Sequence, residues 1–219
     1  MINVDLHIHT RYSGDSDITF EQLVERCQKL GLGAVAITDH GTADGALSMA
    51  CQPAPFKIIV GEEVASSEGE IIGLFLKESI PNGLSPEETI RRIRAQEGLV
   101  CIPHPFDRYR SSAMKGTSLE RIAEHVDIIE VFNSRTIQMQ NLKLPEEFAI
   151  RNKLLVGAGS DAHSIADIGR AYVTIPNFEN RHEFLRSMAQ AQIYGKRPSM
   201  ATYFRSLLRQ IRKRFRRKQ

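Results

Sequence analysis

Histidine and carboxylate residues recur directly after short apolar segments of this 219-residue chain. His7 and His9 end the first segment, where a strand period of two places both imidazoles on one face. Later segments are followed by the remaining candidates, which are His40, Glu63, His104, Asp161 and His163. Imidazole and carboxylate ligands without thiolates suit Zn²⁺, Mn²⁺ or Fe²⁺. Because one catalytic zinc ion needs about three protein ligands, a set of this size predicts at least two metal ions.

A structural role is the alternative for each of these residues. A lone histidine at a strand end is usually a hydrogen-bonded structural group or a surface group, and we expect this role for His125 and His182, which lie in helical patterns. For the complete set this explanation is poor, because it must account separately for every polar group buried at the end of a strand. The set therefore predicts a metal centre.

The segments that carry these residues alternate between short β-rich apolar runs and helical patterns. Strands are predicted at residues 2–8, 33–38, 57–64, 70–76, 99–103, 127–132, 154–159 and 171–175. Capping motifs that begin at Thr19, Ser85, Thr117 and Asn180 predict helix starts between them. The alternation predicts an α/β fold with a mostly parallel sheet, either open and doubly wound or closed as a barrel. In a closed barrel, side chains that follow different strands converge on one face.

Five motifs resemble those of the PHP family, the polymerase and histidinol phosphatase superfamily of metal-dependent phosphoesterases. The motifs are Asp5-Leu6-His7-Ile8-His9-Thr10, Thr38-Asp39-His40-Gly41, Gly61-Glu62-Glu63-Val64, Ile102-Pro103-His104-Pro105 and Gly159-Ser160-Asp161-Ala162-His163. They occur in the order of the family and span residues 1 to about 175. The resemblance implies a distorted (β/α)7 barrel of the PHP type, with up to three metal ions at the C-terminal ends of the strands.

The resemblance also implies how the ligands are shared between metal sites. One site would be formed by His7, His9, Glu63 and Asp161. Glu63 would also bridge to a second metal ion, which is held by His104. The implied cofactors are therefore two or three divalent ions, either manganese, zinc or iron.

The remaining ligands follow from the same resemblance. A third site would use His40 and His163 together with an aspartate from the loop after the first strand. Asp15 is preferred to Asp17, because its offset of six residues from the second histidine of the first motif is usual in the family. Glu70 lies near the position where several relatives have a further histidine. If Glu70 replaces that histidine, the second site is rich in carboxylate and favours Mn²⁺.

Two neighbouring cations lower the pKa of a bridging water from about 15.7 towards about 7, so that a metal-activated hydroxide can hydrolyse a phosphate ester. Arginine side chains that bind the phosphate are also expected. The candidates are Arg11, Arg108, Arg110, Arg135 and Arg170. Of these, Arg108 and Arg135 are preferred. Asp161 or His163 would relay the proton to the leaving oxygen.

The charge of the chain is unevenly distributed. Lys and Arg outnumber Asp and Glu by 29 to 26, yet eight basic and no acidic residues fall within 205–219. Apolar residues recur there at helical spacing, at Phe204, Leu207, Leu208, Ile211 and Phe215. We therefore predict a barrel domain at residues 1–198 and a basic amphipathic helix or tail at 199–219. This tail would either dock on the barrel or bind nucleic acid or an anionic membrane surface.

The leading functional hypothesis is a phosphoesterase that hydrolyses a phosphomonoester or a terminal phosphodiester. Only 33 residues separate Glu70 from His104, which leaves little room for the inserted domain that some nucleotide-specific relatives carry there. The cleft is then expected to be more open, and together with the basic tail this favours a nucleotide or short oligonucleotide substrate. One alternative is a TatD-like nuclease or an amidohydrolase, although no lysine follows a strand to serve as a bridging carbamate. Another is a non-catalytic, metal-stabilised docking module.

Composition argues against other classes of protein. No segment approaches the roughly 20 apolar residues of a membrane helix, and the first residues lack the pattern of a signal peptide. Cys27, Cys51 and Cys101 form no C-x-x-C pair, so we expect reduced thiols in the core. The protein is therefore expected to be cytoplasmic, with peripheral membrane binding through the basic tail as one option.

Overall fold

The computed structural model describes residues 1–136 and 143–196. The predicted domain boundary at residue 198 and the basic segment 199–219 lie outside these residues, so both stay predictions. Within the described ranges, no helix combines the length and the apolar character needed to cross a membrane.

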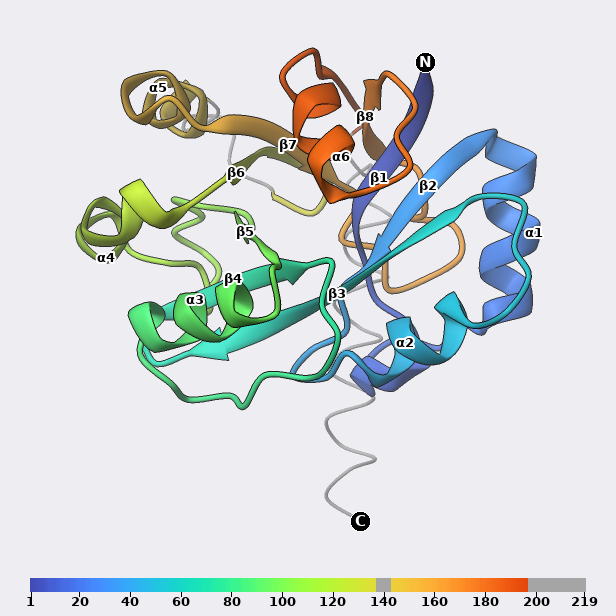
Figure 1. Ribbon diagram of the computed structural model, residues 1–219, viewed down its shortest axis with the longest axis horizontal. Helices are drawn as coiled ribbons and strands as arrows, with labels where there is room; N and C mark the ends of the chain where they lie inside the picture. The colour runs from blue at the N-terminus through green and yellow to red at the C-terminus, as the bar shows by residue number, and fades with distance from the viewer. Residues whose placement is uncertain (137–142, 197–219) are drawn as a thin grey trace.

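In the described residues, one sheet of nine strands forms the centre of the fold and curls into a nearly closed barrel (Figure 1). The strands are β1 (Ile2–Ile8), β2 (Leu32–Ile37), β3 (Lys57–Ser66), β4 (Gly69–Leu74), β5 (Leu99–Ile102), β6 (Ile128–Asn133), β7 (Leu155–Gly159), β8 (Ala171–Ile175) and β9 (Gln192–Gly195). Their order in the sheet is β7-β6-β5-β4-β3-β2-β1-β8-β9. The distorted barrel expected from the sequence is thereby confirmed.

The predicted dominance of parallel pairing is wrong, since four of the eight strand pairings in the described part of the chain are antiparallel. β1, β2 and β3 pair in parallel, as do β5, β6 and β7. β4 lies antiparallel between these groups, because the short turn between Ser66 and Gly69 can join only antiparallel strands. β8 and β9 also pair antiparallel, beyond β1.

Hydrogen bonds close the barrel between β1 and the segment that follows β7. The N–H of Asp161 donates to the carbonyl oxygen of His7 at 2.8 Å. The buried carboxylate of Asp5 accepts from the N–H groups of Ser160 and Gly169 at 2.9 and 3.0 Å. Burial raises the pKa of Asp5 to about 6, although these hydrogen bonds lower it. The closure brings the ends of β1 and β7 together, and with them two of the predicted ligand motifs.

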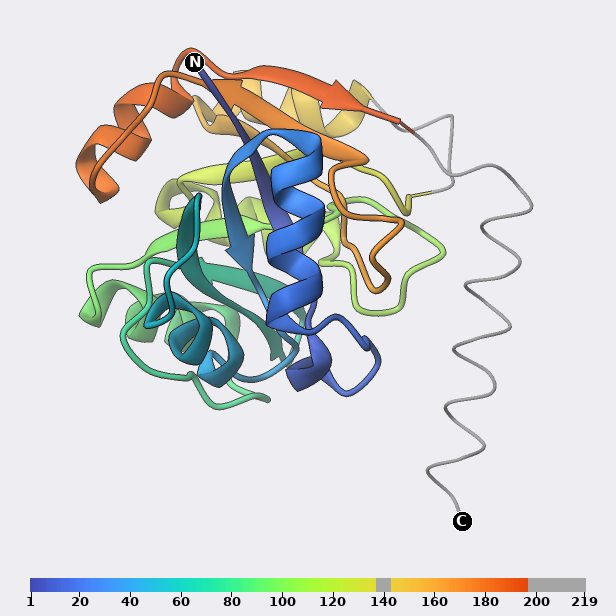
Figure 2. The ribbon, with the colours of Figure 1, turned by 90° about the vertical axis from the view of Figure 1, so that its right-hand side faces the viewer.

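Helices surround the barrel (Figures 1 and 2). They are α1 (Phe20–Leu30), α2 (Asp44–Ala50), α3 (Pro86–Ala95), α4 (Gly116–Ile122), α5 (Lys143–Asn152) and α6 (Arg181–Met188), with the 3-10 turns η1 (Arg11–Ser13) and η2 (Ala123–His125). Thr19, Ser85 and Asn180 cap α1, α3 and α6 as predicted, each accepting from a backbone N–H. The predicted start at Thr117 is wrong, because α4 already begins after the extended backbone of Lys115.

The three cysteines are free thiols, but only two belong to the core. Cys27 and Cys101 are buried, as predicted. Cys51 is exposed because it directly follows the last residue of α2, at the surface, so its predicted place in the core is wrong.

Candidate metal centre

The structure brings the nine predicted metal ligands together at one end of the barrel. Glu70 lies near the start of β4, at the same end as the C-termini of β3 and β5, because β4 runs antiparallel to both neighbours. His104 and Asp161 have φ values of 32° and 52°, in the left-handed region that is costly for residues other than glycine. Strained backbone of this kind is concentrated at functional sites.

Glu63 occupies the centre of the cluster. Its Oε1 lies 3.0 Å from His104 Nε2 and 3.4 Å from His7 Nε2. Its Oε2 lies 2.9 Å from His40 Nδ1 and 3.4 Å from His9 Nε2. The two oxygens thus face two different pairs of histidines, an arrangement that suits a carboxylate shared between two cations.

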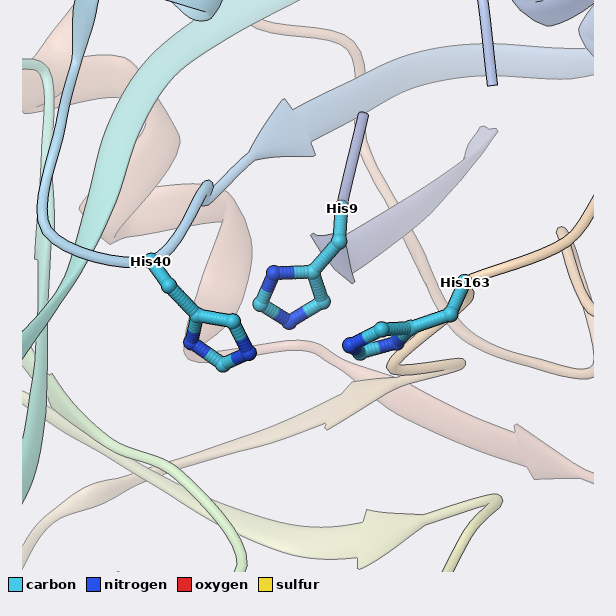
Figure 3. A group of neighbouring side chains, drawn as sticks. All are labelled: His9, His40 and His163. Atoms are coloured by element: carbon cyan, nitrogen blue, oxygen red, sulfur yellow. The ribbon is translucent and has the colours of Figure 1, made fainter. Parts of the chain in front are cut away.

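A second group of ligands surrounds Asp15 on a more exposed side of the cluster. The imidazoles of His9, His40 and His163 converge there (Figure 3), and the ring centroid of His9 lies 4.2 Å from each of the other two. Asp15 Oδ2 lies 3.1 Å from His163 Nε2 and 3.6 Å from His40 Nε2. Asp17, the less favoured alternative, is exposed.

Several buried polar atoms of the cluster have no hydrogen-bond partner among the described residues. They are Asp15 Oδ1, Glu63 Oε2, Glu70 Oε2 and His104 Nδ1, although Glu63 Oε2 and Glu70 Oε2 each lie near an imidazole nitrogen, at 2.9 and 3.3 Å, without the geometry of a hydrogen bond. Uncompensated carboxylate oxygens are costly to bury, whereas a divalent cation satisfies them. Three sets of side chains are suited to such ions, because within each set the ligand atoms all lie within 4.8 Å of one another. The sets are His9, His40 and His163; His7, His9 and Glu63; and His40, Glu63 and Glu70. The residues therefore fit divalent metal ions.

The carboxylates and imidazoles shift one another's protonation. Burial alone would raise the pKa of Glu63 and of Asp161, but the charges of His7 and Arg110, respectively, help to hold both well below the ordinary range. Burial would lower the pKa of His7 and of His40, yet neighbouring carboxylates raise both, that of His40 to about 11. Without a metal ion, Glu63 and Asp161 are thus ionised, and His7 and His40 would have to release their extra proton to bind a cation.

Glu130, which the sequence did not indicate, contacts two of the predicted ligands. Its Oε1 lies 3.2 Å from His7 Nδ1, so that a proton on Nδ1 leaves the Nε2 lone pair facing the cluster. Its Oε2 accepts from the backbone N–H of His104 at 2.7 Å and from Asn133 Nδ2 at 2.9 Å. A glutamate inside the apolar run of β6 was the signal that could have identified it.

Ser13 and Asp39 orient His9 in a similar way. His9 Nδ1 lies 3.1 Å from Ser13 Oγ, and that hydroxyl donates to Asp39 Oδ1 at 2.7 Å. Since the Ser13 proton is directed to Asp39, Ser13 accepts from His9 Nδ1, which leaves His9 Nε2 available to a cation. Asp39 also accepts from the N–H and the hydroxyl of Thr10 at 2.6 and 2.7 Å. Asp39 lies in one of the five motifs, but only the fold reveals these partners.

Comparison with known proteins places this centre in a family. A model of the PHP domain matches residues 5–99, and a model described as PHP-associated matches residues 141–193. An uncharacterised protein of Methanocaldococcus jannaschii is 40% identical over 145 residues, which are 61% of this chain and 82% of that protein. The chain belongs to the PHP family.

Two further proteins are similar over most of this PHP-family chain. A probable phosphatase of Caldicellulosiruptor saccharolyticus is 27% identical over 225 residues, covering 84% of this chain and 91% of that protein. A two-domain protein of Bacteroides vulgatus, containing a predicted PHP-like metal-dependent phosphoesterase, has a solved structure with a TM-score of 0.69 and 15% identity. That likeness covers 95% of this chain and 69% of the other, and it is a likeness of fold.

Two arginines of the PHP barrel converge on Asp161 from different loops. Arg110 Nη2 donates to Asp161 Oδ2 at 2.7 Å, and Arg135 Nη1 lies 3.3 Å from Asp161 Oδ1. Arg135 Nη1 also lies 2.5 Å from His163 Nδ1. Both guanidiniums are therefore at the edge of the cluster, in a position to bind an anion there.

The other arginine candidates are placed differently. Arg108, which the sequence favoured, is exposed. The N–H of Arg110 donates to the carbonyl of Asp107 at 3.3 Å, and this turn places Arg110 at the cluster instead. Arg11 is exposed at η1, and Arg170 pairs with a neighbouring aspartate at 3.5 Å. Of the preferred pair, only Arg135 contacts a predicted metal ligand in the described part of the chain.

Replacing Ser13 by alanine is expected to weaken metal binding to the PHP centre about tenfold, because partners that orient metal-binding histidines typically contribute about ten- to hundredfold in affinity. Competition with a chromophoric chelator measures this change. Ser48→Ala, at an exposed position of α2, is the matched control and should leave the affinity unchanged. Equal affinities of Ser13→Ala and the unmodified protein would contradict the assigned role of Ser13.

Proposed function

We propose that the chain hydrolyses a phosphomonoester or a terminal phosphodiester with the aid of divalent metal ions. The observation that carries this proposal is the position of Glu63, whose two oxygens face separate pairs of histidines. The two guanidiniums at Asp161 add the positive charge that a bound phosphate needs. Membership of the PHP family supports the same reaction.

The donor set supports Mn²⁺, Zn²⁺ or Fe²⁺ as the cofactor, in two or three sites. The proposed ligands are His7, His9, Glu63 and Asp161 for the first ion, Glu63, Glu70 and His104 for the second, and Asp15, His40 and His163 for the third. When bound, such ions lower the pKa of water and polarise the phosphoryl oxygens of a substrate. The additional carboxylate of Glu70 favours manganese at the second site.

The side chains at the edge of the cluster would bind the phosphate and move a proton. Arg110 and Arg135 donate hydrogen bonds to the non-bridging oxygens from two sides. Burial would raise the pKa of Asp161, but both guanidiniums lower it, so Asp161 is ionised and unsuited to donate a proton. His163, whose side chain is 11% exposed, is therefore the better group to protonate the leaving oxygen when the third metal site is empty, since a bound ion would occupy its ring nitrogen.

A nucleotide or the end of a short oligonucleotide is the proposed substrate class. The 33 residues between Glu70 and His104 are taken up by the rest of β4, by α3 and by β5 with their connections, so no inserted domain stands beside the centre there. The side chain of His40 is 35% exposed, which supports an accessible centre. Binding of nucleic acid or an anionic membrane by the basic segment 199–219 stays a prediction.

A substrate panel tests the proposed function. Phosphate release is followed with Mn²⁺, Zn²⁺ or Fe²⁺ from simple monoesters, nucleoside bisphosphates and short 5′-phosphorylated oligonucleotides, with Asp161→Ala as the inactive control. We expect turnover that requires both the metal and Asp161, with the best substrate among the nucleotides or oligonucleotides. Turnover of amides without turnover of phosphate esters would favour an amidohydrolase, and no turnover of any compound would favour a docking module.

A further inference from the structure

A cavity of about 460 Å³ lies beside the metal centre, in the loop that follows β5. Its walls come from residues between 106 and 116 and from the start of α5, and they include Phe106, Arg108, Arg110, Met114, Lys115 and Leu144. Small-molecule sites typically have volumes of roughly 300–1,000 Å³. The cavity is therefore large enough for an aromatic or sugar-sized group.

Arg110 connects this cavity to the metal centre. Its side chain lines the cavity, and its Nη2 donates to Asp161 Oδ2 at 2.7 Å. A phosphate bound by Arg110 and Arg135 would therefore have one side next to the cavity. The leaving group of a phosphate ester is the part of the substrate that can extend into it.

The cavity carries an excess of positive charge. Arg108 and Lys115 line it, both are exposed, and neither forms an ion pair within residues 1–136 and 143–196. Asp107 also lines the cavity, but it is only 8% exposed and its carboxylate accepts from the N–H of Tyr109 at 3.1 Å. Its second oxygen lies 4.0 Å from Arg110 Nε. The charge of Asp107 is thus engaged within the loop, which leaves Arg108 and Lys115 available to an anion.

Apolar side chains form another part of the wall. Met114 is buried, and Phe106 packs edge-on against Phe148 of α5, with ring centroids 5.8 Å apart. Phe106 also has a φ of 63°, a strained conformation for a residue other than glycine. The cavity therefore combines an apolar wall, which is held in place by α5, with two unpaired cations.

We propose that this cavity binds the leaving group of the substrate, and that Arg108 and Lys115 recognise a second anionic group on it. The inference rests on the proposed hydrolysis of a phosphate ester at the metal centre. Because both cations are exposed, their attraction for an anion is modest and weakens as the salt concentration rises.

Binding of two phosphonates to the Mn²⁺-loaded protein tests the proposal without turnover. Benzylphosphonate and 4-carboxybenzylphosphonate differ in the second anion, and we expect the carboxylate to tighten binding by about fivefold at low ionic strength. In the double variant Arg108→Ala, Lys115→Ala, the two compounds should bind within about twofold of each other. The control Lys29→Ala, Arg186→Ala removes the same charge from α1 and α6, outside the cavity lining, and should keep the preference.

Equal affinities of the unmodified protein for the two phosphonates would overturn the proposal, as would a preference that survives in the cavity variant. Phosphate release from phenyl phosphate, measured in parallel, does not involve a second anion. If phenyl phosphate is hydrolysed but the two phosphonates bind equally well, the proposed leaving-group site is rejected and the proposed function is retained. A preference that depends on Arg108 and Lys115, without hydrolysis of any phosphate ester, would reject the proposed function alone.

Discussion

Changing Glu63 to glutamine is expected to lower kcat/KM for phosphate-ester hydrolysis by about a thousandfold. Each of the Glu63 oxygens lies within 3.4 Å of two imidazole nitrogens, and the amide replaces one oxygen and removes the negative charge. Stabilisation of the transition state by a metal ion contributes several kcal/mol, and about 1.4 kcal/mol corresponds to a tenfold change in rate. Phosphate release measures the loss of activity, and the metal content of the purified variant measures the loss of metal binding.

Glu62 supplies the matched control on the same strand. Because side chains alternate along β3, Glu62 faces away from the cluster, and its Oε2 accepts from the N–H of Ile80 at 2.8 Å. Burial raises the pKa of Glu62 to about 7, although this hydrogen bond lowers it, so the neutral amide of Glu62→Gln is a close substitute. We expect activity near that of the unmodified protein. An equal loss in both variants would indicate damage to β3, and full activity of Glu63→Gln would reject its bridging role.

Most of the candidate ligands could be located from the sequence because they lie at the end of an apolar segment whose strand character is local, whereas Asp15 and Glu70 were indicated only by the family resemblance. β1 has its predicted bounds, and the strand end places His7 and His9 at the rim of the barrel. His125 and His182, which were assigned to a structural or surface role, are exposed. β9, in contrast, was not predicted, because it is only four residues long, is mostly exposed and shows no clear alternation.

The residues that orient the ligands could not be predicted, because their partners are distant in the sequence. Glu130 contacts His7 across 123 positions, and neither segment alone indicates the pairing. Whether Arg108 or Arg110 reaches the cluster depends on the turn at Asp107. The two arginines are only two positions apart, and the sequence does not show which of them the turn directs inward. The contacts of the residues that orient the candidate ligands therefore depend on long-range closure of the barrel, whereas most candidate ligands themselves can be recognised from local sequence patterns.

Removing bound metal ions with a chelator is expected to abolish hydrolysis and to lower Tm by about 10 °C. A ligand at about a thousand times its Kd stabilises the folded state by about 4 kcal/mol, and each kcal/mol shifts the Tm of a chain of this size by about 2–4 °C. Part of the cost of removal comes from the buried Oδ1 of Asp15, which lacks a hydrogen-bond partner among the described residues. Thermal unfolding followed by circular dichroism, beside phosphate release, measures both effects.

Adding Mn²⁺, Zn²⁺ or Fe²⁺ back to the stripped protein separates a catalytic centre from a structural one. In a catalytic centre, the Tm and the hydrolysis return together, and Glu63→Gln shows a smaller rise in Tm because its amide is a weaker ligand. A Tm that recovers without hydrolysis of any ester would assign the ions to stability and favour the docking module. A Tm and a rate that are both insensitive to the chelator would contradict the metal centre, since nine ligands around one space would then need another source of compensation.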